Sequence, residues 1–89
     1  MLRKEVTIIN KLGLHARAAS KFVTLASGFQ SDIRLARGSR EVSGKSILGV
    51  MMLAAGRGTS LELIAEGADE EHAVRALEEL IGMRFGEEE

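Results

Sequence analysis

The chain has 89 residues, 45% of them hydrophobic and 28% charged, which is the composition of one ordinary globular domain. Twelve Lys and Arg against thirteen Asp and Glu give a net charge of −1, which disfavours a basic nucleic-acid-binding protein. The absence of Cys excludes disulfides and thiolate chemistry. No apolar run approaches the roughly 20 residues of a membrane span, and residues 1–5 do not resemble a secretory signal. We therefore expect a single cytoplasmic domain over residues 1–89.

The core of such a domain must be mainly aliphatic, because the chain has three Phe and neither Trp nor Tyr. A domain of this size buries only about 60–65% of the surface that its unfolded chain exposes. A deep, enclosed active site is therefore not expected, and any chemistry should take place at the surface.

The first elements along the chain are a strand and a helix. Residues 5–9 are rich in β-branched side chains and predict a strand, and residues 10–13 form a loop. A helical pattern then begins at His15, and Gly28 is expected to end this helix as its C-cap. The apolar positions that define one helical face are Ala19, Phe22, Val23 and Ala26.

A hairpin and a short helix follow. Residues 31–36 alternate apolar and polar side chains, a tight turn is predicted at 37–40, and residues 41–43 form a short return strand. Residues 46–53 predict a short helix with Ser46 as its N-cap.

The last elements are a strand at 59–67 and a helix that begins at Asp69 as N-cap. Its apolar stripe consists of Val74, Leu77, Leu80 and Ile81. Gly82 is a candidate end, although Phe85 could extend the helix, and residues 87–89 are predicted to be a frayed acidic tail.

The resulting order of elements is βαββαβα. Each alternating strand needs one buried face, and the two amphipathic helices can cover that face of a sheet. The sequence therefore predicts an α+β fold, with a mostly antiparallel sheet and helices layered on one side.

The segment from Gly13 to Arg17 is the strongest candidate site, because a histidine stands at the start of the first predicted helix. The first backbone N–H groups of a helix have no partner within the helix, and with the helix dipole they form a ready anion site. Gly13 permits a tight turn before the helix, and the Arg17 guanidinium can reach the same anion. A neutral imidazole is a competent nucleophile, so these residues suit the transfer of a phosphoryl group to His15.

A plainer interpretation of the same position stays open, since a histidine at a helix start can simply be a polar cap or a surface residue. His72, which lies among glutamates in the last predicted helix, is expected to be a solvated surface residue. Two distant histidines without Cys do not suggest a metal site, and no dinucleotide or phosphate-loop motif is present. We therefore expect neither a metal nor a cofactor.

The second informative segment is the apolar helix at 46–53. A short helix cannot bury all of its apolar side chains, so some of Ile47, Leu48 and Met51 should be exposed and form a docking surface. The alternative is that the whole run belongs to the core. Ser46 could be an ordinary N-cap, or a regulatory position where added negative charge would disturb docking.

Two segments of the chain resemble the HPr family, the histidine phosphocarriers of the bacterial phosphotransferase system. Residues 13–19, GLHARAA, resemble the active-site signature of this family, and residues 43–51, SGKSILGVM, resemble its regulatory-serine segment. The resemblance implies an open-faced sandwich, in which a four-stranded antiparallel sheet carries three helices on one face.

The resemblance also implies roles for individual residues. His15 would accept a phosphoryl group at Nδ1 from phosphorylated enzyme I and donate it to a histidine of an enzyme IIA protein, with Arg17 stabilising the group. Ser46 would be the target of an HPr kinase/phosphorylase. Such a protein is a covalent carrier rather than a free-standing catalyst. The sequence departs from the family at Ala18, where Pro is usual; alanine is a good helix former and restores an N–H donor there.

A carrier of this kind must present one face to both donor and acceptor. We predict that this face contains, besides His15 and Arg17, the residues Ser20, Lys21, Ile47, Leu48 and Met51. Basic side chains around an apolar patch imply partners with acidic rims. The net charge of −1 and the lack of an aromatic stacking platform disfavour a nucleic-acid partner. No membrane insertion is expected, and a monomer is the default for a shuttling carrier. The alternative function is a regulatory binding module that controls transcription or metabolism through docking dependent on Ser46.

Overall fold

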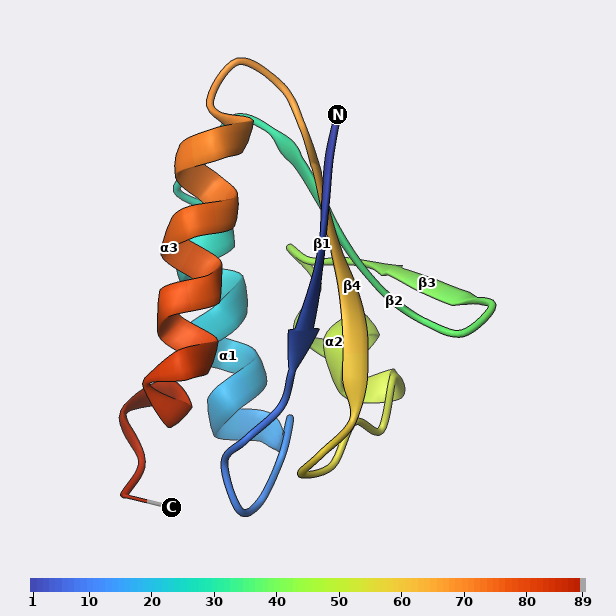
Figure 1. Ribbon diagram of the computed structural model, residues 1–89, viewed down its shortest axis with the longest axis vertical. Coiled ribbons are helices and arrows are strands. Elements are labelled where there is room, and N and C mark those ends of the chain that lie inside the picture. Colours follow the sequence, from blue (N-terminus) through green and yellow to red (C-terminus); the bar gives the residue numbers. More distant parts are fainter. Residues whose placement is uncertain (89) are drawn as a thin grey trace.

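The computed structural model describes residues 1–88, and it confirms the predicted α+β fold and the order of its elements (Figure 1). The strands and helices are β1 (Leu2–Thr7), α1 (Ala16–Ala26), β2 (Asp32–Arg37), β3 (Arg40–Ser43), α2 (Ile47–Met52), β4 (Ser60–Glu66) and α3 (Glu70–Gly82). One turn of 3-10 helix, η1 (Arg84–Gly86), follows α3. No helix formed by residues 1–88 is long and apolar enough to cross a membrane.

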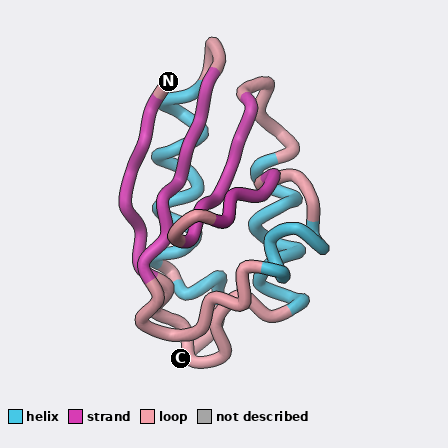
Figure 2. The backbone as a smooth tube through the Cα atoms, turned by 90° about the vertical axis from the view of Figure 1, so that its right-hand side faces the viewer, coloured by secondary structure: helices cyan, strands magenta, loops and turns pink. Residues whose placement is uncertain are grey.

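The four strands form one antiparallel sheet in the order β1-β4-β2-β3. Helices α1 and α3 lie side by side against one face of the sheet, and the shorter α2 packs against α1 and β3 (Figures 1 and 2). The open-faced sandwich implied by the family resemblance is therefore the observed architecture.

The core lies between this sheet and the helices and is mainly aliphatic, as predicted. On β4 the alternating residues Leu61, Leu63 and Ala65 are buried, and the predicted stripe of α1 is buried as well. Phe22 of α1 and Phe85 of η1 are the largest completely buried side chains. Burial of side chains of this size contributes about 1.5–3 kcal/mol each, so the core supplies most of the driving force for this fold.

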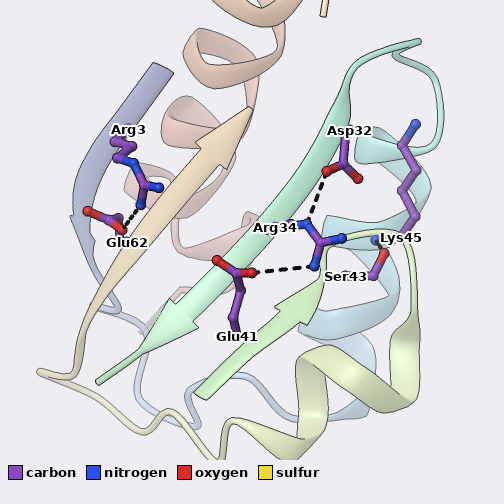
Figure 3. Close-up of polar contacts among 7 residues, drawn as sticks. All are labelled: Arg3, Asp32, Arg34, Glu41, Ser43, Lys45 and Glu62. Carbon is purple, nitrogen blue, oxygen red and sulfur yellow. Dashed lines mark hydrogen bonds and ion pairs between the residues drawn. The ribbon is translucent and has the colours of Figure 1, made fainter. Parts of the chain in front are cut away.

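The other face of the sheet carries charged side chains, which surround the buried Ile64 (Figure 3). Arg3 Nη1 lies 2.7 Å from Glu62 Oε1. Arg34 forms two ion pairs, from Nε to Asp32 Oδ2 at 3.0 Å and from Nη1 to Glu41 Oε2 at 3.5 Å. Surface ion pairs of this kind contribute only about 0–1 kcal/mol each. The exposed face therefore gives the sheet a solvated exterior and carries none of the predicted functional residues.

Two predicted boundaries were wrong. The first strand lies at Leu2–Thr7 instead of 5–9, because its register with β4 pairs Leu2 with Ala65 and Thr7 with Ser60. The first helix ends at Ala26, and Gly28 is not its C-cap. Ser27 takes that place in right-handed conformation, and its N–H donates to Val23 O, so no left-handed glycine is needed.

Asp69 occupies the predicted N-cap position of α3, but its carboxylate does not cap this helix. It accepts hydrogen bonds from Gln30 N at 2.9 Å, Ser31 N at 2.9 Å and the Ser31 hydroxyl at 2.5 Å. The Ser31 hydroxyl, followed by the Gln30 N–H, holds the pKa of Asp69 below its usual value. Asp69 therefore fastens the start of β2 to the start of α3.

The prediction of a frayed acidic tail was wrong for Glu87. Helix α3 ends at Gly82, and η1 then turns the chain back so that Phe85 is buried and Glu87 is half-buried. The segment that follows η1 comes to lie near the loop that precedes α1 (Figures 1 and 2). Glu89 lies outside the described residues.

Candidate functional site

The loop before α1 is held in place by backbone contacts. Gly13 has φ +68, and a Cβ atom there would collide with the carbonyl group of Ala55. The N–H of the next residue, Leu14, donates to that same carbonyl at 2.9 Å, and the Leu14 side chain is buried. The tight turn expected at Gly13 is confirmed, and it fixes where the following residue stands.

His15 is the N-cap residue of α1, as predicted, with φ −72 and ψ 175. Its carbonyl accepts the first helical hydrogen bond, from Ala19 N at 2.8 Å. Its side chain makes no capping hydrogen bond to any residue within 1–88. The N–H groups of the first helical turn therefore lack a capping side chain, which is the condition for an anion site at a helix start. Ala18 lies in this turn and contributes an N–H group that a proline would lack.

A surface hollow brings the predicted site residues together. The His15 side chain retains 28% of its exposure, and the exposed Arg17 lines the same hollow. The full lining consists of Lys11, Leu12, His15, Arg17, Glu87 and Glu88. The imidazole and the guanidinium thus share an opening that an external group can reach.

Glu87 contacts His15 directly, and the sequence analysis missed this residue. Its Oε2 lies 2.5 Å from His15 Nε2, and its Oε1 accepts a hydrogen bond from Asn10 Nδ2 at 3.0 Å. The Asn10 bond first, and the His15 bond second, hold the pKa of Glu87 below its usual value. An ionised carboxylate can only accept hydrogen bonds, so in a neutral imidazole this contact favours the proton on Nε2 and the lone pair on Nδ1.

The remaining predicted residues on α1 differ in their surroundings. Ser20 is half-buried. Lys21 is also half-buried, and its Nζ donates to the backbone carbonyl of Phe85 at 2.6 Å. Its ammonium group is therefore used to hold the C-terminal segment.

Helix α2 begins at Ser46, as predicted, and the Ser46 Oγ accepts a hydrogen bond from Gly49 N at 3.0 Å. Only Val50 of this helix is buried. The prediction of an exposed apolar patch is confirmed, with exposed fractions of 44% for Ile47, 71% for Leu48 and 38% for Met51. Met52, at 55%, extends the patch, and the alternative that the whole run is core was wrong.

Helix α2, which carries the patch, packs against α1, which begins directly after His15. His72 is exposed on α3, as predicted, and belongs to neither the patch nor the hollow.

Comparison with known proteins agrees with this geometry. A family model described as the PTS HPr component phosphorylation site matches residues 2–82. The chain belongs to the HPr family. It is 54% identical to the phosphocarrier protein HPr of Neisseria meningitidis over 89 residues, which is all of both chains. With HPr of Pseudomonas aeruginosa it shares 57% identity over 86 residues, covering 96% of each chain.

Solved structures of HPr-family proteins have the same fold. A crystal structure of HPr from Thermoanaerobacter tengcongensis matches all of both chains with a TM-score of 0.96 and 46% identity. A solution structure of Crh, the Bacillus subtilis catabolite repression HPr, matches 90% of this chain and 95% of that one with a TM-score of 0.67 and 40% identity. The chain is thus a phosphocarrier of the phosphotransferase system, as the two sequence motifs predicted.

Proposed function

We propose that His15 is the residue that carries the phosphoryl group, accepting it at Nδ1 from phosphorylated enzyme I and donating it to a histidine of an enzyme IIA protein in the cytoplasm. The observation that supports this most strongly is the position of His15. It stands partly exposed at the uncapped start of α1, in the same hollow as Arg17.

The transfer step follows from the chemistry of the imidazole. The Nδ1 lone pair attacks phosphorus, a new N–P bond forms, and the N–P bond to the donor histidine breaks, so that the donor leaves as a neutral imidazole. The phosphoryl oxygens carry the charge throughout this step. The N–H groups at the start of α1 and the Arg17 guanidinium are suited to stabilise that charge.

A carrier must also release the group, so it cannot bind the phosphoryl oxygens too tightly. The exposed site supplies one guanidinium and the N–H groups of one helix turn, and the partner protein would supply the rest only in the complex. Stabilisation that arises only in the transition state speeds transfer without trapping the intermediate. The protein therefore acts as a covalent carrier and not as a free-standing catalyst.

The partners would dock on the apolar patch of α2 and on the neighbouring surface of α1. Ile47, Leu48 and Met51 offer apolar contact area, and Ser20 and Arg17 lie on the adjoining helix. Lys21, which the sequence placed in this face, would contribute mainly through its carbon stem because its ammonium group is bonded to Phe85. The Arg17 charge favours partners with acidic rims.

Ser46 would be phosphorylated by an HPr kinase/phosphorylase. Ser46 directly precedes Ile47 and Leu48 in the chain, and both of these side chains are exposed. A phosphate group adds about 1.5 to 2 negative charges at pH 7, which would repel an acidic rim and hinder apolar contact.

Regulation by docking is a second candidate function, and the similarity to Crh, the catabolite repression HPr, favours it. In that case the patch of α2 would bind a regulator of transcription or metabolism, and the state of Ser46 would set the affinity.

The two functions are distinguished by labelling. The protein is incubated with phosphoenolpyruvate and enzyme I, and acid-labile phosphate is measured. We expect the label to be lost in His15→Ala and retained in Ser46→Ala. Equal labelling of wild type and His15→Ala would refute the role of His15. Absence of acid-labile label from the wild type would leave regulatory docking as the better account.

A further inference from the structure

We propose that Glu87 is a positioning residue for His15, which keeps the proton on Nε2 and so leaves Nδ1 as the nucleophile. This inference rests on the proposed function, because it names the group that prepares His15 for transfer. Glu87 is 72 residues away in sequence, and its Oε2 lies 2.5 Å from His15 Nε2.

A C-terminal strap, defined here as residues 83–88, brings the carboxylate to this place. The strap is anchored by Phe85, whose side chain is 1% exposed. Lys21 Nζ donates to the Phe85 carbonyl at 2.6 Å, and Glu87 N donates to Arg84 O at 2.9 Å. Arg84 and Phe85 both have positive φ, at 58 and 56, a left-handed conformation that is unfavourable for residues other than glycine. Burial of the Phe85 ring offsets that cost and holds the strap in one conformation.

The two oxygens of Glu87 have different partners. Asn10 Nδ2 donates to Glu87 Oε1 at 3.0 Å and also to the Gly13 carbonyl at 2.9 Å. Because both of these groups are acceptors, the orientation of the Asn10 amide is fixed and it presents only N–H to the carboxylate. Glu87 Oε2 is then left to accept from His15 Nε2.

The negative charge of the Glu87 carboxylate is opposite to the positive charge that the His15 ring acquires on phosphorylation. After transfer, His15 has phosphorus on Nδ1 and hydrogen on Nε2, so the ring is formally positive. An anion on the Nε2 side stabilises that ring, and no proton has to move when the group arrives or leaves. A buried carboxylate that fixes a histidine tautomer and stabilises its cation acts in the same way in hydrolytic triads.

The arrangement makes a sharp prediction for Glu87→Gln. Asn10 still requires an acceptor, so the Gln carbonyl oxygen would turn toward Asn10 and the NH₂ group toward His15. An NH₂ group can only donate, so Nε2 would have to accept, and the proton would move to Nδ1. The isosteric variant therefore removes the nucleophile. Glu87→Ala imposes no tautomer on His15 and should slow phosphoryl transfer less than Glu87→Gln does.

The primary test is the tautomer of His15, measured by ¹⁵N NMR well above the ordinary pKa of an imidazole. We expect Nε2–H in the wild type and a shift to Nδ1–H in Glu87→Gln. Glu71→Gln is the matched control, since it removes the same charge from an exposed position at the start of α3, outside the hollow, and should leave Nε2–H in place. An unchanged tautomer in Glu87→Gln would overturn the proposal.

The second readout is the rate of phosphoryl transfer from enzyme I. One reversed hydrogen bond corresponds to about a tenfold change in tautomer population, so Glu87→Gln should be about tenfold slower than wild type. Glu87→Ala should fall between the two, and Glu71→Gln, outside the hollow, should match wild type. A strap with a merely structural role would reverse the order and make Ala the slower variant, which would refute tautomer control. Failure of the proposed function is separate: His15→Ala would still be labelled, whatever the NMR result.

Discussion

The N-cap residues of α1 and α2 differ in whether their side chains cap their own helix. At α2 the N-cap residue Ser46 turns its hydroxyl back onto the helix and accepts from Gly49 N. At α1 the N-cap residue His15 makes no such bond within residues 1–88. Its ring nitrogen Nε2 contacts the carboxylate of Glu87 instead. A self-capped start stabilises its own helix, whereas an uncapped start keeps its N–H groups for an external anion.

The largest effect is expected from converting the start of α1 into one like that of α2. His15→Asn places a strong capping side chain at the N-cap, so phosphoryl acceptance should be abolished. The new cap contributes about 1 kcal/mol and offsets the loss of the contact with Glu87, so the free energy of unfolding should not fall. Labelling by enzyme I and chemical denaturation measure the two quantities. A marked loss of stability would mean that His15 is chiefly a structural residue.

The next effect concerns the cation at α1. Arg17→Ala should slow transfer about 10- to 100-fold, because a hydrogen bond to a charged group contributes about 1.5–3 kcal/mol. The side chain is exposed, so the melting temperature should change little. Rapid-quench transfer rates and thermal unfolding on the same preparation test this. Parallel losses of rate and melting temperature would instead indicate a structural role for Arg17.

A smaller effect is expected at the self-capped start. Ser46→Asp keeps a capping oxygen, so the helix should persist while the added charge weakens docking to enzyme I. Ser46→Ala is the matched variant, which should lose about 1 kcal/mol of stability with no loss of affinity. Calorimetric titration with enzyme I and denaturant unfolding separate the two. Unchanged affinity in Ser46→Asp would argue against docking beside this residue.

The N-cap position of α3 is occupied by Asp69, and its substitution is expected to have the smallest effect on phosphoryl transfer. The pKa of Asp69 is lowered by the Ser31 hydroxyl and the Gln30 N–H, so its contribution to stability is present above the unfolded-state pKa. That contribution is lost as the pH falls through the folded-state pKa. Asp69→Asn should lower the melting temperature at pH 7 and much less at low pH, with transfer unaffected. A loss that is independent of pH would contradict the role of this carboxylate.

Much of the fold could be predicted from the sequence because its elements have strong local patterns. The alternation of Leu61, Leu63 and Ala65 on β4 requires one buried face, and the stripe of α1 has helical spacing. The strand order and the exact ends of β1 were not predictable, because register depends on the partner strand and not on local pattern.

The candidate site was predictable only in part. The positions of His15 and Ser46 follow from local helix-start chemistry, and the exposure of Leu48 follows from the shortness of α2. Glu87 was missed because its role depends on a left-handed turn at Phe85 and on a contact across the whole chain. The one local signal was Phe85 itself, a large apolar side chain beyond the end of the last helix, which indicates that the tail folds back.

The central claim is that a phosphoryl group is carried on one named atom. Phosphorylation of ¹⁵N-histidine-labelled protein by enzyme I, followed by NMR detection of the nitrogen bonded to phosphorus, tests it directly. The account predicts phosphorus on Nδ1 of His15, with Nε2 still protonated beside Glu87. Phosphorus on Nε2, or on His72, would contradict it.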